Sequence, residues 1–247
     1  MSRVFRAVVM MKNEPVLPRT VPETRIGVWF QSSRIWNDYV LLPALEELWR
    51  LAAGTIASNP VVLDAGCGHG VGVEWVATKA APSKLYAVDE DQALVETAKR
   101  RAGMLGIDAE IRCMSVCRLD LPDNSVDLVI CHQTLHHVTD QESALREFRR
   151  VLRPHGVLLL AESCWPFLRR LPVRLFFRHP PSARRIADDY LSLLKRHHFV
   201  VDPARVSFPR PFWTLARPSQ GAGASVDSPL CHAVAVRSEG DETGDRT

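Results

Sequence analysis

Short apolar segments alternate with amphipathic segments through the middle of the chain. Apolar runs rich in Val, Ile, Leu and Ala occur near 61–65, 85–89, 109–113, 126–131 and 156–162. Segments with helical spacing of apolar residues lie between them, near 71–79, 91–104 and 141–152. Short apolar runs are typical of buried strands, and three- and four-residue spacing is typical of helices that bury one face. The alternation predicts a parallel sheet with right-handed helical crossovers.

The pattern before this core is weaker. Residues 1–33 show no clear period and contain several prolines, which predicts a mobile or loosely packed segment. Residues 36–53 place Leu, Trp and Ala at helical spacing, which predicts a helix with Pro43 near its start or at a kink.

The pattern after the core predicts one more helix over 182–198 and two more strands, over 200–208 and 230–236. The Gly-, Ser- and Ala-rich stretch 217–228 between those strands predicts a flexible loop. We therefore expect a leading segment and cap helix over 1–58, one α/β domain over 59–238 and a polar, flexible tail over 239–247.

The most informative motif is the stretch from Val61 to Gly72, in which an apolar run ends in Asp64 and glycines follow at alternate positions. A strand, a glycine turn and a helix in this order open a nucleotide-binding α/β unit. Glycines at 66 and 68 allow a positive φ and let the backbone approach a ligand closely. The amides of the turn and of the following helix would favour an anionic group there.

A second acid strengthens this prediction. Asp89 ends the next apolar run, and a carboxylate at the tip of that strand can accept both hydroxyl groups of a ribose. A glycine turn followed by a spaced acid indicates an adenosine-containing ligand. The dinucleotide fingerprint would place its last glycine at Val71, which argues against a nicotinamide-dependent oxidoreductase.

Asp64 stands two residues before Gly66, and this arrangement resembles motif I of the class I S-adenosylmethionine-dependent methyltransferases. The segments 121–129, 134–138 and 145–162 also resemble the family's fourth strand, the turn after it, and the helix and fifth strand. The resemblance extends over about residues 60–163. It implies a doubly wound, seven-stranded, mostly parallel sheet in an α/β/α sandwich, with an antiparallel seventh strand, and S-adenosyl-L-methionine as cofactor.

The resemblance also implies which residues bind the cofactor. One position departs from the family pattern, because Ser115 stands where an acid often accepts from the adenine amino group. A hydroxyl can still accept, but without the help of a charge. The expected cofactor-binding residues are Asp64, Gly66, Cys67, Gly68, Asp89, Glu90, Ser115, Val116 and His132.

Three residues are candidates for catalysis. His136 and His137 follow the fourth strand, where methyl donor and acceptor would meet, and a His can remove a proton from an attacking hydroxyl. Glu162 ends the fifth strand and is a further candidate for the base. The alternatives are that the His pair only packs or orders a loop and that Glu162 orients the substrate or faces solvent.

Composition narrows the class of protein. The formal net charge of +3 is too small to argue for a nucleic-acid partner, and no apolar run approaches the ~20 residues of a membrane span. The six cysteines lack the spacing of a secreted disulfide framework, and Cys113 and Cys117 lack the second pair that a zinc motif needs. These features predict a cytoplasmic protein with reduced thiols, and no metal site is expected.

The segment 165–185, which we call the basic lid, is the second unusual feature. It contains six arginines and no acid, interleaved with Phe and Leu. It is a lid with a solvated basic face, or a surface for a membrane or an anionic amphiphile, which arginines and aromatic residues together suit. Contact with nucleic acid is the third alternative.

The sequence thus predicts methyl transfer from S-adenosylmethionine to a small, hydrophobic or aromatic acceptor. The chain also resembles the quinone and small-molecule branch of the family. A nucleic-acid partner is not expected, because residues 131–134 lack the Asn/Asp-Pro-Pro-aromatic motif of the family members that methylate amino groups of nucleic acids. The alternatives are a non-catalytic cofactor-binding or interaction protein and a methyltransferase that acts on a macromolecule. The sequence does not predict the oligomeric state.

Overall fold

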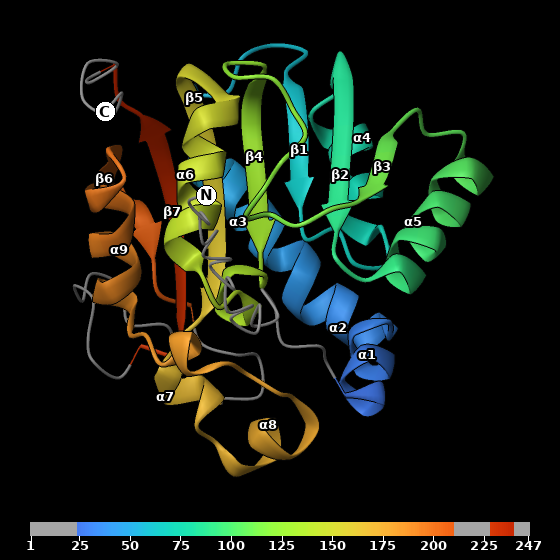
Figure 1. Ribbon diagram of the computed structural model, residues 1–247, viewed down its shortest axis with the longest axis vertical. Coiled ribbons are helices and arrows are strands. Elements are labelled where there is room, and N and C mark those ends of the chain that lie inside the picture. The colour runs from blue at the N-terminus through green and yellow to red at the C-terminus, as the bar shows by residue number, and fades with distance from the viewer. Residues whose placement is uncertain (1–23, 210–227, 240–247) are drawn as a thin grey trace, which may run out of the picture.

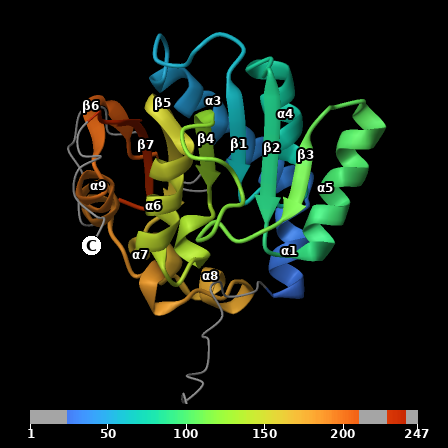
Figure 2. The ribbon, with the colours of Figure 1, turned by 45° about the horizontal axis from the view of Figure 1, so that its top comes forward.

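In a computed structural model, the protein is described over residues 24–209 and 228–239. Within them, strands form one sheet in the order β3-β2-β1-β4-β5-β7-β6, with helices on both faces (Figure 1 and Figure 2). β7 runs antiparallel to β5 and β6, and the other neighbours are parallel. The predicted fold is confirmed, including its antiparallel seventh strand. The strands are β1 Val61–Ala65, β2 Lys84–Asp89, β3 Glu110–Cys113, β4 Val126–His132, β5 Leu152–Ser163, β6 Phe199–Ser207 and β7 Leu230–Arg237.

The helices divide into two layers that bury the two faces of the sheet. α3 (Leu42–Leu51), α4 (Val71–Lys79) and α5 (Gln92–Leu105) pack on one face. α6 (Gln141–Val151) and α9 (Ala187–Arg196) pack on the other face. Because both faces are covered, the central strands bury nearly every residue, which explains why their sequences are continuously apolar.

A third group of short helices lies beyond the carboxyl ends of the central strands (Figure 1). The group bridges distant parts of the chain, since the Phe30 and Phe177 rings meet edge to face at 6.3 Å. The Trp165 amide donates to the Arg185 carbonyl at 2.7 Å and closes the base of the basic lid. The group comprises α1 (Arg25–Gln31), α2 (Arg34–Trp36), η1 (Asn37–Leu41), η2 (Leu135–His137), α7 (Trp165–Leu168), α8 (Leu171–Phe176) and η3 (Pro181–Ala183).

Two local predictions were wrong. Arg25–Gln31 forms a helix, α1, although the sequence around it shows no period. The helix predicted over 182–198 begins only at Ala187, where the Asp189 carboxylate accepts from the Ile186 amide at 2.9 Å.

The other flanking predictions have mixed outcomes. The helix predicted over 36–53 consists of a π-helical turn followed by α3, with Pro43 in the first turn of α3. The ranges 217–227 and 240–247 lie outside the described residues. No helix within the described residues is long and apolar enough to cross a membrane.

Candidate active site

The glycine turn joins β1 to α4 and forms the floor of the site. Gly66 and Gly68 have φ values of 88° and 50°, in the region that favours glycine. A Cβ on Gly66 would lie 2.0 Å from the Thr134 hydroxyl oxygen, so this glycine lets the turn approach the loop after β4. A Cβ on Gly68 would meet nothing within 4 Å, so Gly68 borders open space.

The turn is tied to the end of β2. The amides of Gly66 and Cys67 donate to the Val88 carbonyl at 2.8 and 2.9 Å, and the Gly68 amide donates to Asp89 Oδ2 at 2.9 Å. These three amides are therefore engaged within the protein, and the expectation that they would hold an anionic group is wrong for them. A ligand that lacks a phosphate at this turn fits better than a dinucleotide does.

A cavity of about 570 Å³ lies above this turn at the carboxyl ends of the strands. Ser115 is not among its lining residues; its hydroxyl accepts from the Cys117 amide at 3.2 Å instead. His69, Gln92, Trp36, Asn37 and Thr134 also line it and were not predicted from the sequence. The predicted residues that do line it are Asp64, Gly66, Cys67, Gly68, Asp89, Glu90, Val116, His132 and, from the catalytic candidates, His137.

Asp64 is a buried acid in this cavity, and one of its carboxylate oxygens lacks a hydrogen-bond partner among the described residues. Its side chain is 4% exposed, and the oxygen without a partner is Oδ2. Burial, with repulsion from Asp89, raises the pKa of Asp64 to about 7. The absence of a side chain at Gly72 leaves room for the Asp64 carboxylate, because a Cβ there would lie 2.8 Å from Asp64 Oδ2. Such a carboxylate favours a cationic ligand group.

Asp89 and His132 lie on either side of Asp64, at the ends of β2 and β4. Burial raises the pKa of Asp89, although the amides of Gly68 and Asp91 donate to its carboxylate. Burial lowers the pKa of His132 to about 3, so its ring is neutral near pH 7. Its Nε2 has no hydrogen-bond partner among the described residues.

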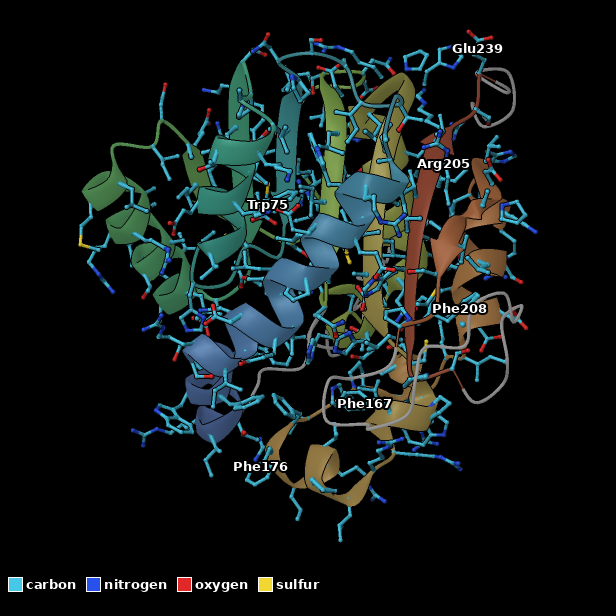
Figure 3. The ribbon with its side chains drawn as sticks, turned by 180° about the vertical axis from the view of Figure 1, so that it is seen from behind. Trp75, Phe167, Phe176, Arg205, Phe208 and Glu239 are labelled. Atoms are coloured by element: carbon cyan, nitrogen blue, oxygen red, sulfur yellow. The ribbon has the colours of Figure 1, made fainter. Side chains whose placement is uncertain are left out.

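A second cavity, of about 280 Å³, adjoins the first, and Gln31, Trp36, Gln133 and His137 line both. Its other walls come from α1 and the basic lid, including Phe30, Phe167, Val173, Phe176 and Phe177. Figure 3 shows Phe167 and Phe176 beyond the edge of the sheet, on the side where α1 lies. None of its lining residues is Asp, Glu, Lys or Arg, so this cavity suits an apolar molecule.

The three predicted catalytic residues lie together beside the second cavity. His136 lines the second cavity, and its Nδ1 lies 2.5 Å from Glu162 Oε2. Glu162 is 0% exposed and also accepts from the amides of Thr134 and Leu135 at 3.1 and 2.7 Å. Glu162 lines neither cavity and holds the η2 turn, which favours a positioning role over direct contact with an acceptor.

His179 joins this group from the basic lid. Its ring stacks on that of His137, with centroids 5.0 Å apart. Burial lowers the pKa of His179 to about 3 and that of His137 well below its ordinary range. Sequence reasoning missed His179 because it lies in no periodic segment; the only signal was that it is the one His within 165–185.

Comparison with known proteins agrees with the fold. Residues 63–160 match a family model described as a methyltransferase domain. A probable S-adenosylmethionine-dependent methyltransferase of Mycobacterium tuberculosis is 33% identical over 58% of this chain and 46% of its own length. A ubiquinone/menaquinone biosynthesis C-methyltransferase of Cupriavidus taiwanensis is 27% identical over 63% of this chain and 66% of its own length.

Among solved structures, a SAM-dependent methyltransferase from Aquifex aeolicus superposes with a TM-score of 0.61. It is 20% identical, and the match covers 85% of this chain and 96% of that one, which supports the fold. The chain spans between 31% and 46% of the length of the first curated relatives it matches.

The region 63–160 is similar to S-adenosylmethionine-dependent methyltransferases, whose cofactor is S-adenosylmethionine. The residues of the first cavity fit this cofactor. The buried Asp64 carboxylate suits its cationic end, the Asp89 carboxylate suits ribose hydroxyls, and the open space at Gly68 leaves room for close approach.

Proposed function

We propose that this protein transfers a methyl group from S-adenosylmethionine to a small hydrophobic or aromatic acceptor bound in the second cavity. The observation that carries the proposal is the shared wall of the two cavities, which brings an apolar chamber next to the cofactor chamber. The second chamber, at about 280 Å³, has room for a compact acceptor or for one end of a longer one.

The chain's own residues would contribute mainly by positioning. When bound, S-adenosylmethionine supplies an electrophilic methyl group on a sulfonium sulfur. Trp36, Gln133 and His137 line both chambers and would orient the acceptor's reacting atom toward the first one. The aromatic walls exclude water. Holding two reactants in a reactive geometry can supply about 7–11 kcal/mol of a barrier.

A hydrophobic acceptor also needs a route to this chamber. Ile26, Trp29 and Phe176 line it and are 56%, 69% and 44% exposed, so its mouth is apolar on the outside. Leu171 and Leu175 extend this surface with 68% and 66% exposure, among the arginines of the basic lid. We propose that this surface contacts an anionic membrane or amphiphile from which the acceptor enters.

The test of the proposed function is a methyl-transfer screen with labelled S-adenosylmethionine against hydroxylated aromatics, quinones and lipids. With an acceptor in hand, Val173→Phe should narrow the chamber and raise KM several-fold while S-adenosylhomocysteine binds as tightly as before. The matched control is Val200→Phe, at a strand position that is 59% exposed.

Three other outcomes would decide against the proposal. Cofactor binding without turnover on any acceptor would favour a non-catalytic binding protein. Turnover confined to RNA, DNA or protein would favour a macromolecular substrate. An equal loss of activity in the Val173→Phe and Val200→Phe variants would show that the apolar chamber does not hold the acceptor.

A further inference from the structure

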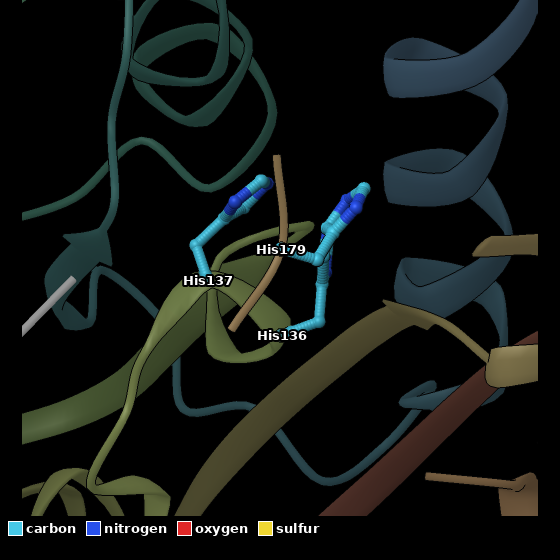
Figure 4. A group of neighbouring side chains, drawn as sticks. All are labelled: His136, His137 and His179. Atoms are coloured by element: carbon cyan, nitrogen blue, oxygen red, sulfur yellow. The ribbon is translucent and has the colours of Figure 1, made fainter. Parts of the chain in front are cut away.

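Three imidazole side chains meet at the inner end of the acceptor chamber. His136 and His137 come from η2, and His179 comes from the basic lid between α8 and η3 (Figure 4). One ring nitrogen from each can be chosen so that all three lie within 4.8 Å of one another. We propose that these three residues bind a divalent transition-metal cation of the zinc type, with an open position that faces the acceptor.

The chemistry of the donors supports a metal of this class. Imidazole nitrogen is a preferred ligand of Zn²⁺, and sites with three protein ligands and one open position are typical of catalytic zinc. Tetrahedral zinc with bonds of about 2.1 Å places ligand nitrogens about 3.4 Å apart. Bringing the three ring nitrogens from within 4.8 Å to that spacing requires side-chain movements of about 1 Å. His179 can make such a movement because it lies on the basic lid, outside the sheet.

The surroundings hold two of the rings in place. The Glu162 carboxylate bonds His136 Nδ1, which leaves Nε2 as the nitrogen that can bind a metal. A carboxylate on the second nitrogen of a His ligand is the usual outer partner in zinc sites, where it fixes the ring and raises its basicity. A hydrogen bond with the Arg178 backbone holds the His137 ring in a similar way.

The chamber suits a cation that acts on an acceptor oxygen. Imidazole ligands add no charge to a bound metal, and none of the residues that line the chamber is an acid. Only Glu162, which acts through His136, would offset part of the charge of a divalent ion. An acceptor hydroxyl, phenolic or enolic, would lose its proton to water and bind as the oxyanion, which is the stronger nucleophile. The metal would take over the role of a His base, because a nitrogen lone pair that binds the metal cannot also accept a proton.

The oxyanion assignment rests on the proposed function, whereas the metal site does not. The test uses the full chain stripped with a chelator and titrated with Co²⁺, which reports four-coordinate sites by its visible absorption. We expect one equivalent to bind, to be displaced by Zn²⁺, and to bind at least about 100-fold more weakly to His179→Asn. The control is His155→Asn, since His155 is exposed and its φ of 63° is one that Asn tolerates.

Titration with S-adenosylhomocysteine accompanies each variant and reports whether the first cavity is intact. Failure of the wild-type protein to bind Co²⁺ at micromolar concentration, or equal binding by His179→Asn, would overturn the metal site. Phenol, added as a probe, should shift the visible bands of the Co²⁺-loaded protein, and unchanged bands would overturn the oxyanion assignment. Loss of cofactor binding with Co²⁺ binding intact would instead count against the proposed function alone.

Discussion

Replacing Asp64 by Asn should stabilise the ligand-free protein at alkaline pH while weakening its affinity for the cofactor. The two side chains have nearly the same shape, so the change removes the charge and leaves the packing of β1 in place. Asp64 is 4% exposed, and its Oδ2 has no partner among the described residues, so its ionised form is costly in the folded protein.

The magnitude follows from the pKa. Burial raises the pKa of Asp64 from its ordinary value of 3.8 to about 7, and this difference corresponds to about 4 kcal/mol when the group is fully ionised. Water in the adjoining cavity offsets part of the cost, so we expect the Asn variant to be about 2 kcal/mol more stable at pH 8.

The sign of the pH dependence can be worked out in the same way. Between pH 4 and 7 the folded protein holds the Asp64 proton more tightly than the unfolded chain does. Its contribution to the free energy of unfolding therefore falls as pH rises through this range. The advantage of the Asn variant should be smallest near pH 4 and reach its full size above pH 7.

The assay is urea-induced unfolding of both proteins at pH 5 and pH 8, with S-adenosylhomocysteine titrations at the same two values. Loss of a charged hydrogen-bond partner should weaken cofactor binding at pH 8 by about 10- to 100-fold. If the variant is destabilised equally at both pH values, the carboxylate is not penalised by burial, and the reasoning fails.

Further substitutions test the glycine turn and the surface of the basic lid independently. Gly66→Ala should unfold the protein more easily, by about 2–3 kcal/mol, because its Cβ would collide with Thr134. Gly68→Ala should lower the free energy of unfolding by only about 1–2 kcal/mol, yet it should abolish most of the affinity for S-adenosylhomocysteine. Equal losses of stability and of affinity in the two variants would contradict the open ligand space at Gly68. Leu175→Glu should reduce co-sedimentation of the protein with phosphatidylglycerol vesicles several-fold. The control is Met104→Glu, at a position on α5 that is 80% exposed, and it should leave co-sedimentation unchanged. Equal effects of the two substitutions would exclude membrane contact through the basic lid.

Much of the cofactor half of the site could be predicted because it is built from contiguous sequence. β1 and α4 lie where the apolar run and the helical spacing place them, at Val61–Ala65 and Val71–Lys79. The tips of neighbouring parallel strands meet at one edge, so Asp64, Asp89 and His132 line one cavity as expected. Ser115 escaped this logic because its loop turns the hydroxyl toward the Cys117 amide.

α1 could not be predicted from periodicity because its large apolar residues do not face the sheet. Ile26 and Trp29 are 56% and 69% exposed, and Phe30 contacts Phe177 of the basic lid. The helix is ordered by a Thr24 cap, whose hydroxyl accepts from the Gly27 amide at 3.0 Å, and by contacts made with residues about 150 positions away. Neither cause leaves a repeating signal in the local sequence.

The relatives match only part of the site, and this limits what they indicate about the acceptor. The matched methyltransferase region, 63–160, includes the glycine turn, Asp89 and the His pair of η2. Trp36, Phe177 and His179, which line the second cavity, lie outside that region. A relative that shares only the matched region therefore shares the cofactor chemistry without sharing the walls that select an acceptor. The acceptor must be found by experiments on this chain, with the lid and α1 in place.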